Sequence, residues 1–119
     1  MSFEKNIRSE FVRILEKEWV KDDQVTLYTY RCDGLALYTA PPMGVLFPGT
    51  VQELSSVIKL LNQYKISFVA RGAGTGLSGG AVPQEGSVII EMARFKEVHE
   101  VDWVNRTITV GPGGINLHI

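Results

Sequence analysis

The pattern of hydrophobic and polar positions predicts a helix at the start of the chain. Between residues 2 and 20, apolar side chains recur every three or four positions, with glutamate and lysine between them. This spacing is typical of an amphipathic helix that packs one face against other protein. A membrane-surface helix is disfavoured because the interspersed glutamates would repel an anionic bilayer. The apolar positions are Phe3, Ile7, Phe11, Ile14, Leu15, Trp19 and Val20.

An irregular segment at residues 22–42 separates this helix from a more regular region. It contains the turn signal Asp33-Gly34 and ends at Pro41-Pro42. The short apolar run Val45-Leu46-Phe47 follows and is closed by Pro48-Gly49, which predicts a buried strand.

A second helix is predicted from Thr50 to about Tyr64. The tetrapeptide Thr50-Val51-Gln52-Glu53 matches a capping box, in which the threonine hydroxyl and the glutamate carboxylate satisfy free amides at a helix start. Apolar residues then repeat at helical spacing. We expect the helix to pack across a sheet through Leu54, Val57, Ile58 and Leu61.

The pattern in the rest of the chain predicts strands around a glycine-rich loop. Residues 67–70 and 88–90 predict strands on either side of the loop, and residues 98–110 predict a hairpin that turns at Asn105-Arg106. Gly111-Pro112-Gly113-Gly114 breaks this pattern, and residues 115–119 predict the beginning of a helix. The fold class is therefore α+β, with an α/β-like order of helices and strands.

Composition and charge narrow the possible functions. The chain has 119 residues, 45% hydrophobic and 21% charged, which suits one globular domain with a single core. The formal net charge is -1, whereas proteins that bind nucleic acid through its phosphates carry a basic surplus. We therefore expect no nucleic-acid partner.

Cysteine usage and the N-terminal segment bear on the compartment. Cys32 is the single cysteine, so the chain forms no internal disulfide, which favours a reducing, cytoplasmic compartment. No apolar run approaches the ~20 residues that a membrane span needs, and the first residues are polar. We expect a cytoplasmic protein without a membrane span, and peripheral attachment to a membrane through a partner stays open.

The two histidines offer no evident chemistry. His99 and His118 have no carboxylate or cysteine at metal-ligand spacing. We therefore expect no metal site and assign no catalytic residue within the chain.

The residues that carry chemistry are in the glycine loop, Arg71–Ala81. Five of its eleven residues are glycine, which accepts positive φ and lets the backbone pass close to a ligand. Successive amides in such a loop can form a concavity that binds an anion. Thr75 and Ser78 add hydroxyl donors, and Arg71 adds a permanent positive charge. A pyrophosphate is the natural occupant, and a flexible surface loop is the alternative.

Familiar phosphate-binding loops do not fit this segment. Gly74–Gly79 satisfies G-x-G-x-x-G, but the Rossmann arrangement requires a helix directly after the glycines, and the chain instead continues through a turn into a strand. No Lys-Ser/Thr pair follows, as a Walker loop requires. No V-A-I-K-like segment follows either, as a protein-kinase loop requires. The sequence therefore predicts a nucleotide diphosphate bound between two strands without a Rossmann helix.

The stretch from Phe68 to Pro83 closely resembles the flavin pyrophosphate loop of the FAD-linked oxidase family. Members of this family have an FAD domain of the vanillyl-alcohol-oxidase or p-cresol-methylhydroxylase type. The resemblance covers roughly residues 28–119, and Met92–Glu97 and Val110–Gly113 support it. Within the family, the chain is most similar to the subgroup of glycolate oxidase D subunits and D-lactate dehydrogenases.

The resemblance implies a set of FAD ligands and a mode of attachment. The turn at Pro112 and Gly113 would approach the flavin ring. Relatives that bind flavin covalently at this loop have a histidine at the position of Thr75, so the resemblance implies non-covalent FAD here. The implied pyrophosphate ligands are Arg71, Gly72, Ala73, Gly74, Thr75, Gly76, Leu77, Ser78, Gly79 and Gly80.

The resemblance also implies a division of the chain and an activity. Residues 1–40 would form an N-terminal helical segment, and residues 41–119 the first, incomplete part of an FAD-binding domain, truncated before its second glycine-rich segment. The whole enzyme would oxidise a small 2-hydroxy acid such as glycolate or D-lactate, with hydride passing to the flavin. We expect the chain alone to be inactive and its uncovered apolar surface to favour self-association or partner subunits. A non-catalytic flavin-binding module and an inactive fragment remain the alternatives.

Overall fold

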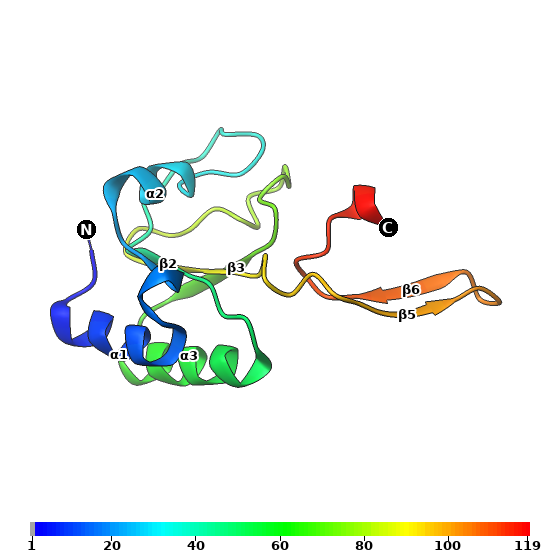
Figure 1. Ribbon diagram of the computed structural model, residues 1–119. Helices are drawn as coiled ribbons and strands as arrows, with labels where there is room; N and C mark the ends of the chain where they lie inside the picture. The colour runs from blue at the N-terminus through cyan, green and yellow to red at the C-terminus, as the bar shows by residue number, and fades with distance from the viewer. Residues whose placement is uncertain (1) are drawn as a thin grey trace.

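A four-stranded sheet forms the centre of the structure, a computed structural model that describes residues 2–119 (Figure 1). The helices are α1 (Lys5–Leu15), α2 (Gln24–Thr29) and α3 (Val51–Gln63), with short 3₁₀ turns η1 (Lys17–Trp19) and η2 (Asn116–His118). The strands are β1 (Val20–Lys21), β2 (Gly44–Leu46), β3 (Phe68–Arg71), β4 (Val88–Glu91), β5 (Val98–Asp102) and β6 (Thr107–Val110).

The order of strands in the central sheet places the glycine loop at one of its edges. The order is β1-β2-β4-β3, with β4 parallel to both neighbours and β1 antiparallel to β2. The glycine loop thus joins two neighbouring strands, β3 and β4, as the sequence predicted. Within residues 2–119, no helix begins between Gly76 and Gly80, which confirms that a Rossmann helix is absent from the loop.

The core has two parts, one on each face of the sheet. Side chains alternate between the faces along a strand, so Val88 and Ile90 of β4 pack in the cluster that includes residues of α1 and α3, while Ile89 packs with Leu27 of α2 on the other face. Figure 1 shows α1 and α3 together on one side of the sheet and α2 on the other. The mixed helix-and-strand fold class is confirmed.

Helix α3 forms where the sequence predicted it, with one change in its buried face. The Thr50 hydroxyl accepts a hydrogen bond from the Glu53 amide at 3.1 Å. The Glu53 carboxylate accepts from the Gly49 amide at 2.7 Å, one residue before the position that a capping box predicts. Val57 and Leu61 are buried, but the expected Ile58 is exposed and Leu60 is buried in its place. The helix is rotated on the sheet relative to the predicted face.

The N-terminal segment is not one helix from residue 2 to residue 20. Helix α1 stops at Leu15 because Glu16 adopts φ 68°, outside the helical region. Val20 is buried as a strand residue, and it pairs with Leu46 of β2. The apolar spacing therefore identified residues that are buried in the core or packed against it, but it extended the helix across a turn and a strand.

The segment interpreted as irregular contains the short helix α2. The Asp23 carboxylate caps it, accepting a hydrogen bond from the Thr26 amide at 3.0 Å. Leu27 is its buried residue. The rest of the segment, up to residue 43, has no regular element.

The predicted hairpin is confirmed as a separate two-stranded sheet of β5 and β6, which extends away from the central sheet (Figure 1). Asp102 accepts hydrogen bonds from the amides of Val104 and Asn105, and Arg106 has φ 54°, which together form the turn. At the C-terminal end, the expected helix is only the 3₁₀ turn η2.

Candidate functional site

The glycine loop leaves β3 at Arg71 and presents a run of free backbone donors. Within residues 2–119, the amides from Gly72 through Ser78 donate to no protein acceptor. Gly74 has φ 69° and Gly79 has φ 80°, conformations that favour glycine. Thr75, Leu77 and Ser78 are exposed at the tip. Consecutive free amides on a loop of this kind are suited to an anion.

The side chain of Arg71, the first residue of the glycine loop, contacts the other end of the same loop. Its Nη1 donates to the carbonyl of Cys32 at 2.7 Å and to the carbonyl of Ala81 at 3.3 Å. The guanidinium carbon lies 5.0 Å from the centroid of the Tyr30 ring. A Cβ on Gly74 would lie 2.2 Å from Arg71 Nη2, so a side chain there would displace the guanidinium from this position. The arginine therefore ties the two ends of the loop to the segment before β2.

A second contact region involves residues that sequence reasoning did not assign to the site. The Gly34 amide donates to the Gly76 carbonyl at 3.1 Å. One carboxylate oxygen of Asp33 accepts from the Gly79 amide at 2.9 Å, and the other accepts from Leu35 at 3.0 Å and Ala36 at 3.2 Å. Asp33-Gly34 was visible in the sequence only as a turn signal.

The ionised form of Asp33 is favoured despite its burial. Burial by itself raises the pKa of Asp33, but hydrogen bonds from the amides of Gly79, Leu35 and Ala36 together outweigh it. The resulting pKa is lower than the ordinary 3.8. Asp33 is therefore a carboxylate at neutral pH.

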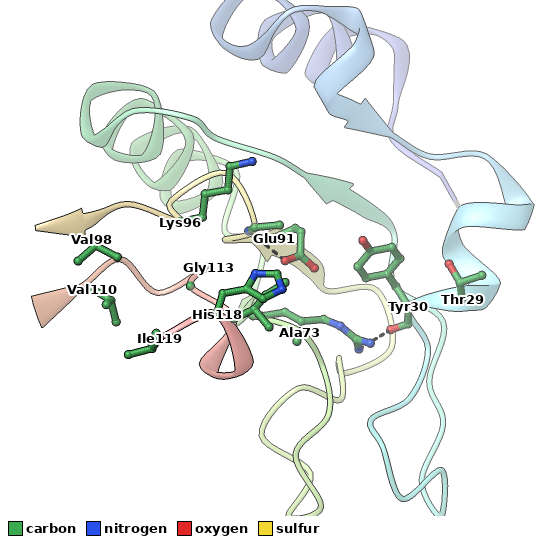
Figure 2. Close-up of a pocket in the computed structure, with 15 residues that line it drawn as sticks. Thr29, Tyr30, Ala73, Glu91, Lys96, Val98, Val110, Gly113, His118 and Ile119 are labelled. Carbon is green, nitrogen blue, oxygen red and sulfur yellow. Dashed lines mark hydrogen bonds between the residues drawn. The ribbon is translucent and has the colours of Figure 1, made fainter. Parts of the chain in front are cut away.

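A cavity of about 680 Å³ opens beside the start of the glycine loop. This volume is within the range of ligand pockets. Figure 2 shows labelled residues that line it and come from several elements: Tyr30, Ala73, Glu91, Lys96, Gly113 and His118. The cavity thus joins the glycine loop, the end of β4 and the segment after β6.

Glu91 is the buried acidic group of this cavity. It is 4% exposed, and its Oε1 accepts a hydrogen bond from the Ala93 amide at 3.1 Å. Burial raises the pKa of Glu91 above its ordinary value, although the Ala93 amide and the charge of Arg71 lower it in part. Burial and the nearby Glu91 also raise the pKa of Tyr30. Both groups hold their protons more tightly than usual.

The predicted turn at Pro112 and Gly113 lies next to the glycine loop. A Cβ on Gly72 would be 3.4 Å from the Pro112 carbonyl oxygen. The Gly113 amide donates to the Phe95 carbonyl at 2.9 Å, and a Cβ on Gly113 would be 2.2 Å from the Met92 carbonyl oxygen. The structure thus brings Pro112 and Gly113 to the first residues of the loop, while Gly79 and Gly80 lie at its far end.

The remaining candidates are placed as follows. His118 lines the cavity, whereas His99 is exposed at an irregularity in the pairing of β5 with β6. Cys32 is a free, partly buried thiol. In the part of the chain that the structure describes, no group of three or more potential metal ligands occurs, and no helix has the length and apolar character to cross a membrane.

The chain matches a known protein family over most of its length. The family described as "FAD binding domain" matches residues 42–118. The match includes the whole glycine loop, Glu91 and the Pro112-Gly113 turn, and it begins after Asp33 and Gly34.

The sequence of the chain is similar to those of a glycolate oxidase subunit and a dehydrogenase. The chain is 42% identical over 90 residues to glycolate oxidase subunit GlcD of Escherichia coli (strain K12), covering 76% of this chain and 18% of that protein. It is 32% identical over 94 residues to D-2-hydroxyglutarate dehydrogenase of Xanthomonas citri pv. viticola, covering 79% of this chain and 20% of that protein. The chain therefore spans about a fifth of the length of these relatives.

Among solved structures, p-cresol methylhydroxylase with substrate bound is similar in fold. The TM-score is 0.79 at 24% sequence identity, with 92% of this chain and 22% of that chain covered. The expected p-cresol-methylhydroxylase type of fold is confirmed.

Proposed function

Because this chain belongs to the FAD binding domain family, we propose that its glycine loop binds the diphosphate of FAD without a covalent bond. We propose further that the chain is part of a flavin-dependent oxidoreductase that oxidises a 2-hydroxy acid such as glycolate or D-lactate. The relatives named glycolate oxidase and D-2-hydroxyglutarate dehydrogenase support this substrate class.

One observation carries the proposal: the run of free amides on the loop opens beside a cavity. The amides from Gly72 through Ser78 have no acceptor within residues 2–119, and Gly72 and Ala73 line the cavity of about 680 Å³. A diphosphate on these amides leaves room for the rest of a dinucleotide along the cavity. The residues present therefore fit FAD.

Each part of the site has a separate task in this proposal. The loop amides bind phosphate oxygens, with the exposed hydroxyls of Thr75 and Ser78 as further donors. Arg71 contributes positive charge, and its hydrogen bonds to the carbonyls of Cys32 and Ala81 hold the loop in place. Pro112 and Gly113 form the wall beside the start of the loop. FAD, when bound, supplies the electron acceptor for the oxidation.

The proposed non-covalent attachment follows from the side chain at position 75. Thr75 offers a hydroxyl and no imidazole for a bond to flavin at this loop. Acid or heat denaturation of the FAD-loaded protein should release the flavin into the supernatant. Flavin fluorescence that stays with the precipitate would show a covalent bond at another residue.

The chain by itself should bind FAD weakly and have no oxidase activity. The tip of the loop is exposed to water, where contacts between donors and phosphate contribute little, because they are strong only when protein excludes solvent.

We propose that residues 41–119 are the first part of the FAD-binding domain and that residues 1–40 form a helical segment before it. Cytoplasmic location, and association with itself or with partner subunits, are also proposed.

The test is a titration of the purified chain with FAD, followed by calorimetry or flavin fluorescence. We expect a Kd weaker than about 1 μM. Thr75→Asp should weaken binding at least tenfold, because it places a carboxylate at the exposed tip where phosphate would lie. Thr109→Asp, an exposed position on β6, is the matched control and should leave the Kd unchanged.

Two outcomes would contradict the proposal. Equal FAD affinity of Thr75→Asp and the unchanged chain would remove the loop from the binding site. Sub-micromolar binding by a monomer would show that these residues already form a complete pocket.

A further inference from the structure

The segment from Tyr30 to Ala36, called the clamp segment below, contacts the glycine loop at three places along its length. At the base, Arg71 donates to the Cys32 carbonyl at 2.7 Å. In the middle, the Gly34 amide donates to the Gly76 carbonyl at 3.1 Å. Towards the far end, the Asp33 carboxylate accepts from the Gly79 amide at 2.9 Å.

We propose that Asp33 is a positioning residue of the cofactor site: by binding the Gly79 amide, it fixes the glycine loop so that its remaining amides face the diphosphate. This inference rests on the proposed function, because it assigns a role within the same site. It lies outside the matched family region, which begins at residue 42.

Apart from the bond to Asp33, the far end of the loop is held by a backbone hydrogen bond from the Val82 amide to the Gly79 carbonyl at 3.1 Å and by little packing. A Cβ built on Gly76, Gly79 or Gly80 would meet no atom within 4 Å, so packing does not confine this part of the backbone. Glycine also loses more conformational freedom on ordering than any other residue. The hydrogen bond from Gly79 to Asp33 therefore supplies a constraint that packing does not, and it reduces the entropy that the cofactor would otherwise have to remove on binding.

Close contact between the clamp segment and the loop supports the same role. A Cβ on Gly34 would lie 2.8 Å from the Thr75 carbonyl oxygen, so the two backbones touch at this point. Asp33 can remain charged beside a diphosphate site because three backbone amides donate to its carboxylate. These donors take up the charge locally, and the carboxylate does not face the ligand uncompensated.

This geometry divides the backbone amides of the loop into two groups. The Gly79 amide is engaged by Asp33, whereas the amides from Gly72 through Ser78 have no acceptor within residues 2–119. We therefore expect phosphate to contact the Gly72–Ser78 amides and not the Gly79 amide. This changes the ligand set that the family resemblance implies.

The test uses backbone amide NMR of the 119-residue chain during titration with FAD. Amide signals within Gly72–Ser78 should shift and saturate, while the Gly79 signal moves little. Asp33→Asn should displace the Gly79 signal even without FAD and should weaken FAD binding about tenfold. The reason is that an asparagine side chain offers one acceptor oxygen, where the carboxylate of Asp33 offers two.

Asp102→Asn is the matched control, because Asp102 also accepts hydrogen bonds from two backbone amides in a turn, but on the β5–β6 hairpin. It should leave the Gly79 signal and the FAD affinity unchanged. If Asp33→Asn does not fold, Gly34→Ala tests the same contact by steric means, and it should also weaken FAD binding.

The outcomes separate the two proposals. If the unchanged chain shows no response to FAD, the proposed function fails and this inference fails with it. If the unchanged chain responds but Asp33→Asn binds FAD equally well, only the role of Asp33 is overturned. A Gly79 signal that shifts with FAD as strongly as its neighbours would likewise overturn it.

Discussion

The central sheet and the β5–β6 hairpin place similar apolar residues in opposite surroundings. In β4, Val88, Ile89 and Ile90 are at most 1% exposed. In the hairpin, Val98 is 55% exposed and Val101 42%. β4 has three apolar residues in a row, whereas β5 alternates valines with His99, Glu100 and Asp102. The valines of β5 are nevertheless apolar side chains that, within residues 2–119, no other element covers.

This difference shows which part of the chain supplies its own stability. Around β2 and β4, both faces of the central sheet are covered by helices or by the clamp segment and its neighbours. The hairpin depends on its Asp102 turn and on cross-strand pairs, which are marginal in water for a two-stranded sheet. We therefore expect the sheet to unfold as the cooperative unit and the hairpin to open first.

The largest expected effect is on the core of the sheet. Leu61→Ala should lower the free energy of unfolding by about 3 kcal/mol, because Leu61 is fully buried between α3 and the sheet. Val101→Ala on the hairpin should lower it by less than about 0.5 kcal/mol. Urea unfolding followed by circular dichroism measures both values. Similar losses for the two variants would show that the hairpin belongs to the cooperative core.

An intermediate effect is expected where the hairpin returns to the sheet. Gly113→Ala should lower the free energy of unfolding by about 1–3 kcal/mol, since its Cβ would overlap the Met92 carbonyl oxygen. Gly80→Ala is the matched control, because a Cβ there meets no atom within 4 Å. The same urea experiment applies. A loss at Gly113 no larger than at Gly80 would mean that the turn moves away at little cost.

The sequence predicted the regular elements best where local chemistry decides them. The Thr50 cap and the apolar period placed α3 correctly, and the glycine density located the loop between β3 and β4. The buried face of α3 was less predictable. Whether Ile58 or Leu60 is buried depends on how the helix is rotated against the sheet, and the apolar period alone does not fix this rotation.

The parts of the site that sequence reasoning missed depend on contacts between distant residues. Asp33 and Gly79 are 46 positions apart, and Arg71 is 39 positions from the carbonyl of Cys32. Nothing local distinguishes the carboxylate that clamps a loop from one that starts a turn. Similarly, Arg71 could be assigned a positive charge from sequence, but its bracing role depends on carbonyl groups that only the fold brings near.

The smallest expected effect concerns Glu91, at the end of β4 where the sheet meets the base of the hairpin. Burial raises the pKa of Glu91 in the folded chain above its ordinary value of 4.5. The contribution of Glu91 to stability is therefore fully present below about pH 4.5 and is lost as the pH rises through the folded pKa. Glu91→Gln should remove this part of the pH dependence, because glutamine does not ionise and its oxygen can still accept from Ala93.

Urea unfolding at a series of pH values from about 4 to 7 measures the effect. Glu91→Gln and the unchanged chain should be similar in stability at the acidic end, and the variant should be the more stable of the two at neutral pH. Glu85→Gln, at an exposed position in the turn before β4, is the matched control and should follow the unchanged chain throughout. Parallel curves for Glu91→Gln and Glu85→Gln would mean that water reaches Glu91 freely. In that case the end of β4 would resemble the exposed hairpin more than the buried sheet to which it belongs.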